Sequence, residues 1–254
     1  MQKLYIIIPA YNEAPNIQAV INAWHPVAVA AGPASKLVVI DDGSKDATYQ
    51  IAVGLKEKYP QMEVVTKLNS GHGPTCLFGY RYAIESGAEY VFQTDSDGQT
   101  DPAEFRLFWE QREGHNFIIG TRCSRQDGIA RKFVTNILRL VLLAIAGVDV
   151  RDANTPYRLM NARVLARYLE HIPADFFLGN ALLSTMAVKR HDSVKWLPIT
   201  FKPRQGGENS LNMKRIVRIG LKAVWEFAGI LHKEKEFLNG EHEYALRAKN
   251  SISR

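Results

Sequence analysis

The sequence is poor in cysteine and has no long hydrophobic run. Its two cysteines, Cys76 and Cys123, are too few for a disulfide framework and indicate a reducing compartment. The longest apolar run, Leu140 to Val148, is about half of the ~20 residues that a membrane-spanning helix requires. The apolar run Leu4 to Ile8 is too short for the core of a signal peptide. We therefore expect neither a secretory signal nor a transmembrane helix.

The sequence also lacks the usual signals of a nucleic-acid partner. It has no basic tail, no zinc-finger spacing and no alternation of aromatic and basic residues. The net charge of +6 is moderate and fits phosphate-bearing substrates or an anionic membrane surface. The chain does have enough apolar sequence for a core, since 46% of its 254 residues are hydrophobic and 23% are charged. One large domain, with or without an appendage, is the expected organisation.

The first half of the chain alternates short β-rich runs with longer helical patterns. Strands are predicted at residues 4–8, 37–40, 64–66, 90–93 and 117–119, and helices at 16–30, 45–59, 71–87 and from 101 onward. This alternation predicts an α/β fold whose central, mostly parallel sheet is flanked by helices.

Helical patterns dominate after residue 122. Helices are predicted at 129–147, 162–170 and 177–190, a loop at 152–158 and an edge strand at 194–201. We expect residues 1–210 to form one domain, with a nucleotide-binding half to about residue 122 and an acceptor-side half after it. Residues 211–254 are expected to form an amphipathic helix and a polar tail.

Five polar or glycine-rich clusters follow directly after predicted strands. They are Pro9–Glu13, Asp41–Ser44, Asn69–Gly73, Asp95–Asp97 and Gly120–Arg122. Ligands of open α/β sheets bind outside the carboxyl ends of the strands. We therefore expect all five clusters to meet at one edge of the sheet and to form the functional site there.

The cluster around Asp95 is the richest in hard oxygen ligands. Asp95 and Asp97 stand one residue apart after a buried strand, with Gly98 to allow a turn and Gln99 as a further oxygen donor. Such a set favours Mg²⁺ or Mn²⁺, with water and substrate phosphate as the remaining ligands. The alternative is an ordinary turn rich in Asp and Gly. The four companion clusters favour the metal site.

The order of the five clusters resembles that of glycosyltransferase family 2. The motifs in this order are Pro-Ala-Tyr-Asn-Glu, Asp-Asp-Gly-Ser, a glycine loop (Asn69–Gly73), Asp-x-Asp and Gly-x-Arg. The resemblance implies a GT-A fold, a nucleoside diphosphate sugar donor, a divalent metal and inversion at the transferred sugar. The second half of the chain is similar to the branch of this family that makes polyprenyl- or dolichyl-phosphate mannose or glucose. The similar positions are Arg131, Asp149–Asp152, Thr155–Arg158 and the segment 198–210.

The resemblance also implies roles for individual residues. The donor nucleotide is expected to contact Pro9, Tyr11, Glu13, Asp42, Gly71, Gly73, Asp95 and Ser96. Asp95, Asp97 and Gln99 are expected to hold the metal, which stabilises charge on the departing nucleoside diphosphate. His72 is a further binding candidate in the glycine loop.

The acceptor determines which other groups the reaction needs. A hydroxyl acceptor must lose a proton to a base, whereas a lipid phosphate is already ionised and needs cations to position it. Residues 175–180 lack the acidic pair that family members with hydroxyl acceptors often carry, which favours a polyprenyl phosphate. The residues expected to bind the acceptor phosphate are Arg122, Arg131, Arg158 and Arg204, and the predicted catalytic set is Asp97, Arg122, Arg131 and Arg158.

Three alternatives stay open. A family 2 enzyme acting on a saccharide hydroxyl would use Asp175 as its base. A non-catalytic nucleotide-sugar-binding protein is an alternative of another class, because a fold does not by itself establish an activity. A nucleotidyltransferase would normally show a glycine-rich signature near the amino terminus, and this sequence has none there.

The segment Leu211 to His232 has the pattern of a helix at a membrane surface. Lys214, Arg218 and Lys222 recur at every fourth position and form a basic stripe beside apolar residues and Trp225. A helix packed on the domain or on a partner would show a similar pattern. We expect peripheral attachment at the cytoplasmic face of a membrane and make no prediction of the oligomeric state.

Overall fold

The computed structural model describes residues 2–125, 139–203, 226–227 and 229–230. The chain divides into two compact units, Met1–Ser210 and Leu211–Arg254. Nearly all of the second unit, including the expected amphipathic helix, lies outside the described residues. Among the residues that are described, no helix has both the length and the apolar composition needed to cross a bilayer.

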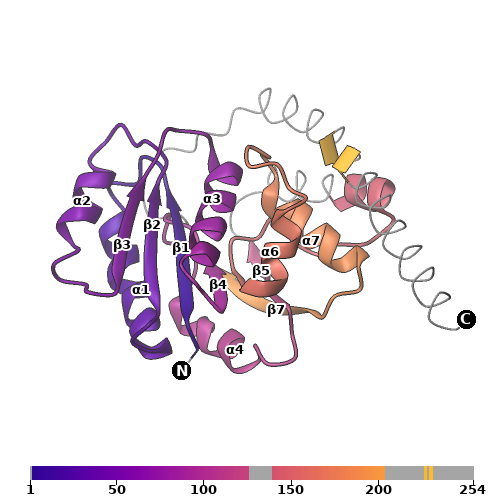
Figure 1. Cartoon of the computed structure of the whole chain (residues 1–254), viewed down its shortest axis with the longest axis horizontal. Helices are drawn as coiled ribbons and strands as arrows, with labels where there is room; N and C mark the ends of the chain where they lie inside the picture. Colours follow the sequence, from indigo (N-terminus) through magenta and orange to yellow (C-terminus); the bar gives the residue numbers. More distant parts are fainter. Residues whose placement is uncertain (1, 126–138, 204–225, 228, 231–254) are drawn as a thin grey trace, which may run out of the picture. The chain divides into compact units, whose positions relative to one another are not determined.

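The first unit begins with alternating strands and helices, as the sequence predicts (Figure 1). In chain order they are β1 (Leu4–Ala10), α1 (Ile17–Ala31), β2 (Lys36–Asp41), α2 (Thr48–Gly54), β3 (Met62–Thr66), α3 (His72–Glu85), β4 (Tyr90–Gln93), the 3₁₀ turn η1 (Pro102–Glu104) and α4 (Phe105–Glu110). They are followed by β5 (Phe117–Arg125), β6 (Arg158–Asn161), α6 (Ala162–Leu169), α7 (Gly179–Lys189) and β7 (Val194–Phe201).

The seven strands form one sheet in the order β3-β2-β1-β4-β6-β5-β7. The pairs β1–β2, β1–β4, β2–β3 and β5–β7 are parallel, whereas β6 runs antiparallel to both β4 and β5. The predicted α/β class and the mostly parallel central sheet are therefore confirmed. The register of β4 and β6 pairs Gln93 with Arg158, a pairing that matters for the site below.

The sheet is covered by helices on both faces because its central strands are apolar on both sides. Leu4, Ile6 and Ile8 of β1 belong to a buried cluster with α1 and the aromatic residues around Trp24. Ile7 points the other way and lies against Gly79 of α3. Helix α3 in turn contacts α6 and α7, which complete the second layer.

The strand β6 is the main element that the sequence did not predict. It consists of four residues, Arg158 to Asn161. The sequence placed Arg158 at the end of the predicted loop 152–158 and indicated no strand before the helix at 162–170. The predicted helix at 129–147 is described only from residue 139, and residues 139–146 are helical. The helix predicted at 45–59 is shorter, Thr48–Gly54, because turns replace helix on both sides of it.

Candidate active site

The polar clusters that follow β1, β2, β3 and β4 meet at the carboxyl edge of the sheet, as predicted. Hydrogen bonds join the loops in sequence. The backbone N–H of Asp42 donates to the carbonyl of Ala10, and the N–H of Lys67 donates to the carbonyl of Asp41. His72, after β3, reaches Asp95, after β4. The site is therefore assembled by the parallel strands themselves.

The segment after β1 separates into exposed and buried positions. Pro9 is a buried strand residue, whereas Tyr11 is exposed and open to a ligand. Glu13 is buried, and its carboxylate accepts a hydrogen bond from the side chain of Asn16 at 2.7 Å. The backbone N–H of Glu13 donates to the hydroxyl of Thr48 at 2.7 Å. Glu13 thus fixes the start of α1 and ties it to α2.

Asp42 is buried and anchors the glycine loop. One carboxylate oxygen accepts from the ammonium of Lys67 and from the N–H of Ser70 at 2.9 Å. The other oxygen accepts from the N–H of Gly71 at 2.9 Å. The backbone of Gly71 has φ of 92°, a conformation that glycine adopts without strain. Asp42 therefore fixes the backbone conformation of the glycine loop.

His72 lies between the glycine loop and the acidic cluster. Its Nε2 is 3.7 Å from Asp95 Oδ1 and 3.5 Å from the sulfur of Cys76, and its side chain is 46% exposed. Contact with Cys76, followed by the negative charges of Asp95 and Asp97, raises the pKa of His72 above its usual 6.5. The raised pKa favours the protonated form of the ring beside the acidic cluster.

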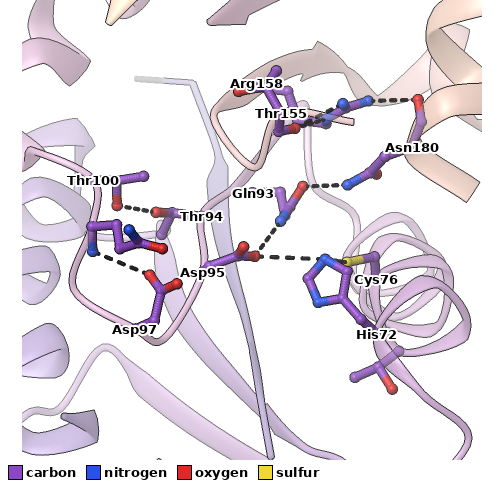
Figure 2. A network of polar contacts seen from close by, with 12 residues as sticks. His72, Cys76, Gln93, Thr94, Asp95, Asp97, Thr100, Thr155, Arg158 and Asn180 are labelled. Atoms are coloured by element: carbon purple, nitrogen blue, oxygen red, sulfur yellow. Dashed lines mark hydrogen bonds and ion pairs between the residues drawn. The ribbon is translucent and has the colours of Figure 1, made fainter. Parts of the chain in front are cut away.

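Asp95 is held at one oxygen and open at the other. Its Oδ1 accepts a hydrogen bond from Gln93 Nε2 at 2.9 Å, as Figure 2 shows. Within the described part of the chain, no group donates to Oδ2, and the side chain is 24% exposed. Asp97 Oδ1 accepts from the backbone N–H of Gln99 at 3.1 Å, while Ser96 between them is buried.

These two carboxylates fit a Mg²⁺ or Mn²⁺ ion. Neither metal needs an all-protein cage, because one or two carboxylates plus water and substrate phosphate complete the coordination. In the described ranges, no group of three or more His, Cys, Asp or Glu side chains is arranged to hold a metal. The two carboxylates supply hard oxygen ligands, the type that both ions take.

Gln99 makes a contact different from the metal ligation expected for it. Its side-chain Nε2 donates to the carbonyl of Lys202 at 2.8 Å, and the N–H of Lys202 donates back to the carbonyl of Gln99 at 2.8 Å. The ammonium of Lys202 also pairs with Asp101 at 2.8 Å. Gln99 therefore joins the acidic loop, Asp95–Gln99, to the end of β7. Metal ligation by Gln99 would use Oε1, the other end of the amide, and stays a prediction.

The prediction for Arg158 needs correction. Arg158 is 1% exposed, and its guanidinium donates to the carbonyls of Ala153, Thr155 and Asn180 at 2.8–3.1 Å. It lies on β6 between β4 and β5, where an acceptor phosphate has no access. Arg158 therefore stabilises the loop before β6 and the start of α7, and we remove it from the phosphate-binding and catalytic sets.

Arg122 lies at the same sheet edge but is paired. Its guanidinium makes two hydrogen bonds to the buried carboxylate of Asp152, at 2.8 and 2.7 Å, and stacks 5.1 Å from the ring of Phe201. Its side chain is 14% exposed. The other two arginines expected at the acceptor, Arg131 and Arg204, lie outside the described residues.

Two buried amides near the acidic loop, Gln93 and Asn180, were not predicted from the sequence as site residues. Gln93 ends a strand that is otherwise apolar, and Asn180 starts an apolar helix. A buried amide requires hydrogen-bond partners. Polar residues at such positions were therefore a signal in the sequence, although it did not indicate which partners they bind.

The fold matches that of known glycosyltransferase structures. The chain resembles glucosyl-3-phosphoglycerate synthase from Mycobacterium tuberculosis, solved with Mn²⁺, uridine diphosphate and glucosyl-3-phosphoglycerate. The TM-score is 0.68 at 16% identity, and the match covers 91% of this chain and 80% of that chain. At this identity the likeness concerns the fold, the GT-A fold of nucleotide-sugar transferases.

The sequence comparisons are more specific. The family model described as Glycosyl transferase family 2 matches residues 5–191, and the chain therefore belongs to that family. Polyprenol monophosphomannose synthase of Mycolicibacterium smegmatis is 28% identical over 247 residues, covering 92% of this chain and 91% of that protein. Undecaprenyl-phosphate 4-deoxy-4-formamido-L-arabinose transferase of Salmonella paratyphi B is 22% identical over 220 residues. The second match covers 86% of this chain but 65% of that protein.

Proposed function

We propose that this protein transfers a hexose, with inversion and with a divalent metal, from a UDP- or GDP-sugar to a polyprenyl phosphate. The observation that carries the proposal is the carboxyl edge of the sheet, where Asp95 presents an open Oδ2 beside Asp97 and the fixed glycine loop. The two sequence relatives support the acceptor, since the names of both contain a polyprenyl phosphate or its mannosyl product.

The donor nucleotide is proposed to lie over the loops after β1, β2 and β3. Tyr11 offers an exposed ring, and the glycine loop offers backbone N–H groups at the start of α3. Glu13 and Asp42 are proposed to support these loops, because protein donors occupy their carboxylates. The remaining residues proposed to contact the donor are Pro9, Gly71, Gly73, Asp95 and Ser96.

Asp95, Asp97 and Gln99 are the residues that would hold Mg²⁺ or Mn²⁺. When bound there, the metal neutralises charge on the diphosphate of the leaving nucleotide. His72 contributes a second positive group next to Asp95. The acidic loop itself supplies no base for the acceptor.

A phosphate acceptor does not require such a base. One of its oxygens is already ionised, and it attacks the anomeric carbon while the bond from that carbon to the nucleoside diphosphate breaks. No proton has to move in this step. Arg122 is proposed to orient the acceptor with Arg131 and Arg204, and Asp152 fixes the position of the Arg122 guanidinium.

The acceptor also implies a membrane surface. A polyprenyl chain lies in a bilayer, so the enzyme must reach its phosphate from the side of the membrane where the nucleotide-sugar is found. We propose peripheral attachment at the cytoplasmic face, through the basic and apolar segment Leu211 to His232.

A panel of radiolabelled nucleotide-sugars, tested with and without undecaprenyl phosphate and Mn²⁺, examines the proposal. We expect label in an organic-soluble, mild-acid-labile product that forms only when both the lipid phosphate and the metal are present. Label confined to a water-soluble glycan would contradict the lipid acceptor. Transfer that is insensitive to chelation of the metal would contradict the metal-dependent mechanism.

A further inference from the structure

Gln93 is a buried amide in direct contact with the acidic loop. It is the last residue of β4, it is 0% exposed, and both ends of its side chain are hydrogen-bonded. Its Nε2 donates to Asp95 Oδ1 at 2.9 Å, and its Oε1 accepts from Asn180 Nδ2 at 2.9 Å (Figure 2). Because one end must donate and the other must accept, the orientation of this amide is fixed.

Asn180 continues the same chain of hydrogen bonds into the second helical layer. The hydroxyl of Tyr80 lies 2.6 Å from Asn180 Oδ1 and 3.1 Å from Gln93 Oε1, and the shorter contact takes its single proton. The donors therefore all point one way, from Tyr80 to Asn180, to Gln93 and to the carboxylate of Asp95. A negative charge at the end of such a chain strengthens each bond in it. Reversal of either amide would place two acceptors or two donors against each other.

The structure also holds Asn180 in place. Its backbone carbonyl accepts from Arg158 Nη1 at 3.1 Å and from the hydroxyl of Ser184 at 3.0 Å. Gly179, the residue before it, lies against Leu77 of α3 so closely that a Cβ atom there would be 2.8 Å from the leucine. The buried position of Arg158 thus has a function: it fixes the start of α7, from which Asn180 supports the acidic loop.

We propose that Gln93 and Asn180 are positioning residues that hold Asp95 Oδ1 and thereby turn Oδ2 toward the divalent metal. This inference rests on the proposed function. A carboxylate that is already fixed loses little freedom when it binds a metal. Hydrogen-bond partners behind metal ligands typically change metal affinity or activity about 10- to 100-fold when they are removed. The metal site would then depend on α7, which belongs to the acceptor-side half.

The test is the affinity for Mn²⁺, measured by electron paramagnetic resonance with UDP and separately with GDP. Gln93→Met has nearly the same volume but no donor for Asp95. Asn180→Asp keeps its shape but no longer donates to Gln93. Thr185→Val is the matched control, since Thr185 is a buried residue of the same helix that donates to the carbonyl of Ala181. All variants are compared at a temperature at which circular dichroism shows them folded.

We expect Gln93→Met to weaken Mn²⁺ binding about 10- to 100-fold and Asn180→Asp to weaken it less, while Thr185→Val leaves it unchanged. If the wild type binds Mn²⁺ and Gln93→Met binds it equally well, the positioning role is wrong although the proposed function stands. An equal loss in Thr185→Val would also overturn the inference. If Gln93→Met does not fold, Asn180→Asp decides. Absence of Mn²⁺ binding in the wild type with either nucleotide would overturn the proposed function, and this inference with it.

Discussion

Two aspartates at the same edge of the sheet, Asp42 after β2 and Asp95 after β4, have different surroundings. Protein donors occupy both oxygens of Asp42, and the residue is 3% exposed. A protein donor occupies one oxygen of Asp95, and the side chain is 24% exposed. One carboxylate at a strand end is therefore held by the protein at both oxygens, whereas the other is held at one. This difference agrees with the roles proposed for them, an anchor of the glycine loop and a metal ligand.

The largest expected effect concerns the ligand-facing carboxylates. Asp97→Ala should lower the rate of sugar transfer about 1,000-fold, because the charge on the leaving diphosphate loses its metal. Its unfolding free energy should change by less than about 0.5 kcal/mol, since the side chain is partly exposed in a loop. Initial rates with the preferred nucleotide-sugar and denaturant unfolding measure the two quantities. Full activity in this variant would remove Asp97 from the metal site.

Arg158 tests the support behind Asp95. Arg158→Met should lower the unfolding free energy by about 3 kcal/mol, because the carbonyls of Ala153, Thr155 and Asn180 lose their donor inside the protein. Arg163→Met is the matched control, since Arg163 is exposed on α6. Urea unfolding compares the pair. Equal stability of the two variants would contradict the structural role given to Arg158.

Asp42→Asn tests the other half of the comparison. The amide places a donor group against backbone N–H groups and weakens the pairing with Lys67, so the unfolding free energy should fall by about 2 kcal/mol. Asp175→Asn, a change at an exposed carboxylate, should leave it unchanged. The same urea titration serves for both variants. A fully stable Asp42→Asn protein would show that this carboxylate is not an anchor.

The smallest effect concerns the link between the acidic loop and β7. The hydrogen bond from Lys202 lowers the pKa of Asp101 below its usual 3.8. Because folding lowers this pKa, the pair stabilises the fold fully at pH values above the usual pKa of 3.8. The contribution is lost as the pH falls through the lowered pKa. Lys202→Met should therefore cost at most about 0.5 kcal/mol at neutral pH and nothing in strong acid. Unfolding measured across that pH range tests the prediction, and a difference that persists in acid would contradict it.

The sequence predicted the parallel sheet and the assembly of its strand-end clusters, because apolar runs and turn residues are local signals. The sequence did not indicate that Asp42 has protein donors at both carboxylate oxygens and Asp95 at only one. The donors that surround Asp42 come from Lys67, Ser70 and Gly71 on another loop, and nothing local to Asp42 indicates them. Asp95, by contrast, is held by Gln93, which lies two residues before it.

Arg158 shows the same limit for a different reason. As a basic residue at the end of a polar loop, it was expected to bind the acceptor phosphate together with Arg122. Its position became clear only with β6, a strand of four residues that is inserted antiparallel between β4 and β5. The pairing of such a short strand depends on the whole sheet, so the local pattern could not predict it.

The most direct test of the contrast between Asp42 and Asp95 is thermal unfolding with and without Mn²⁺, in the presence of UDP or GDP, for Asp42→Asn and Asp95→Asn. A ligand that binds the folded state raises the unfolding temperature. We predict that Asp42→Asn unfolds at a lower temperature without metal but keeps the increase on Mn²⁺ addition. Asp95→Asn should match the wild type without metal and lose the increase. Retention of the full Mn²⁺-dependent increase in Asp95→Asn would contradict the assignment of Asp95 as the ligand-facing carboxylate.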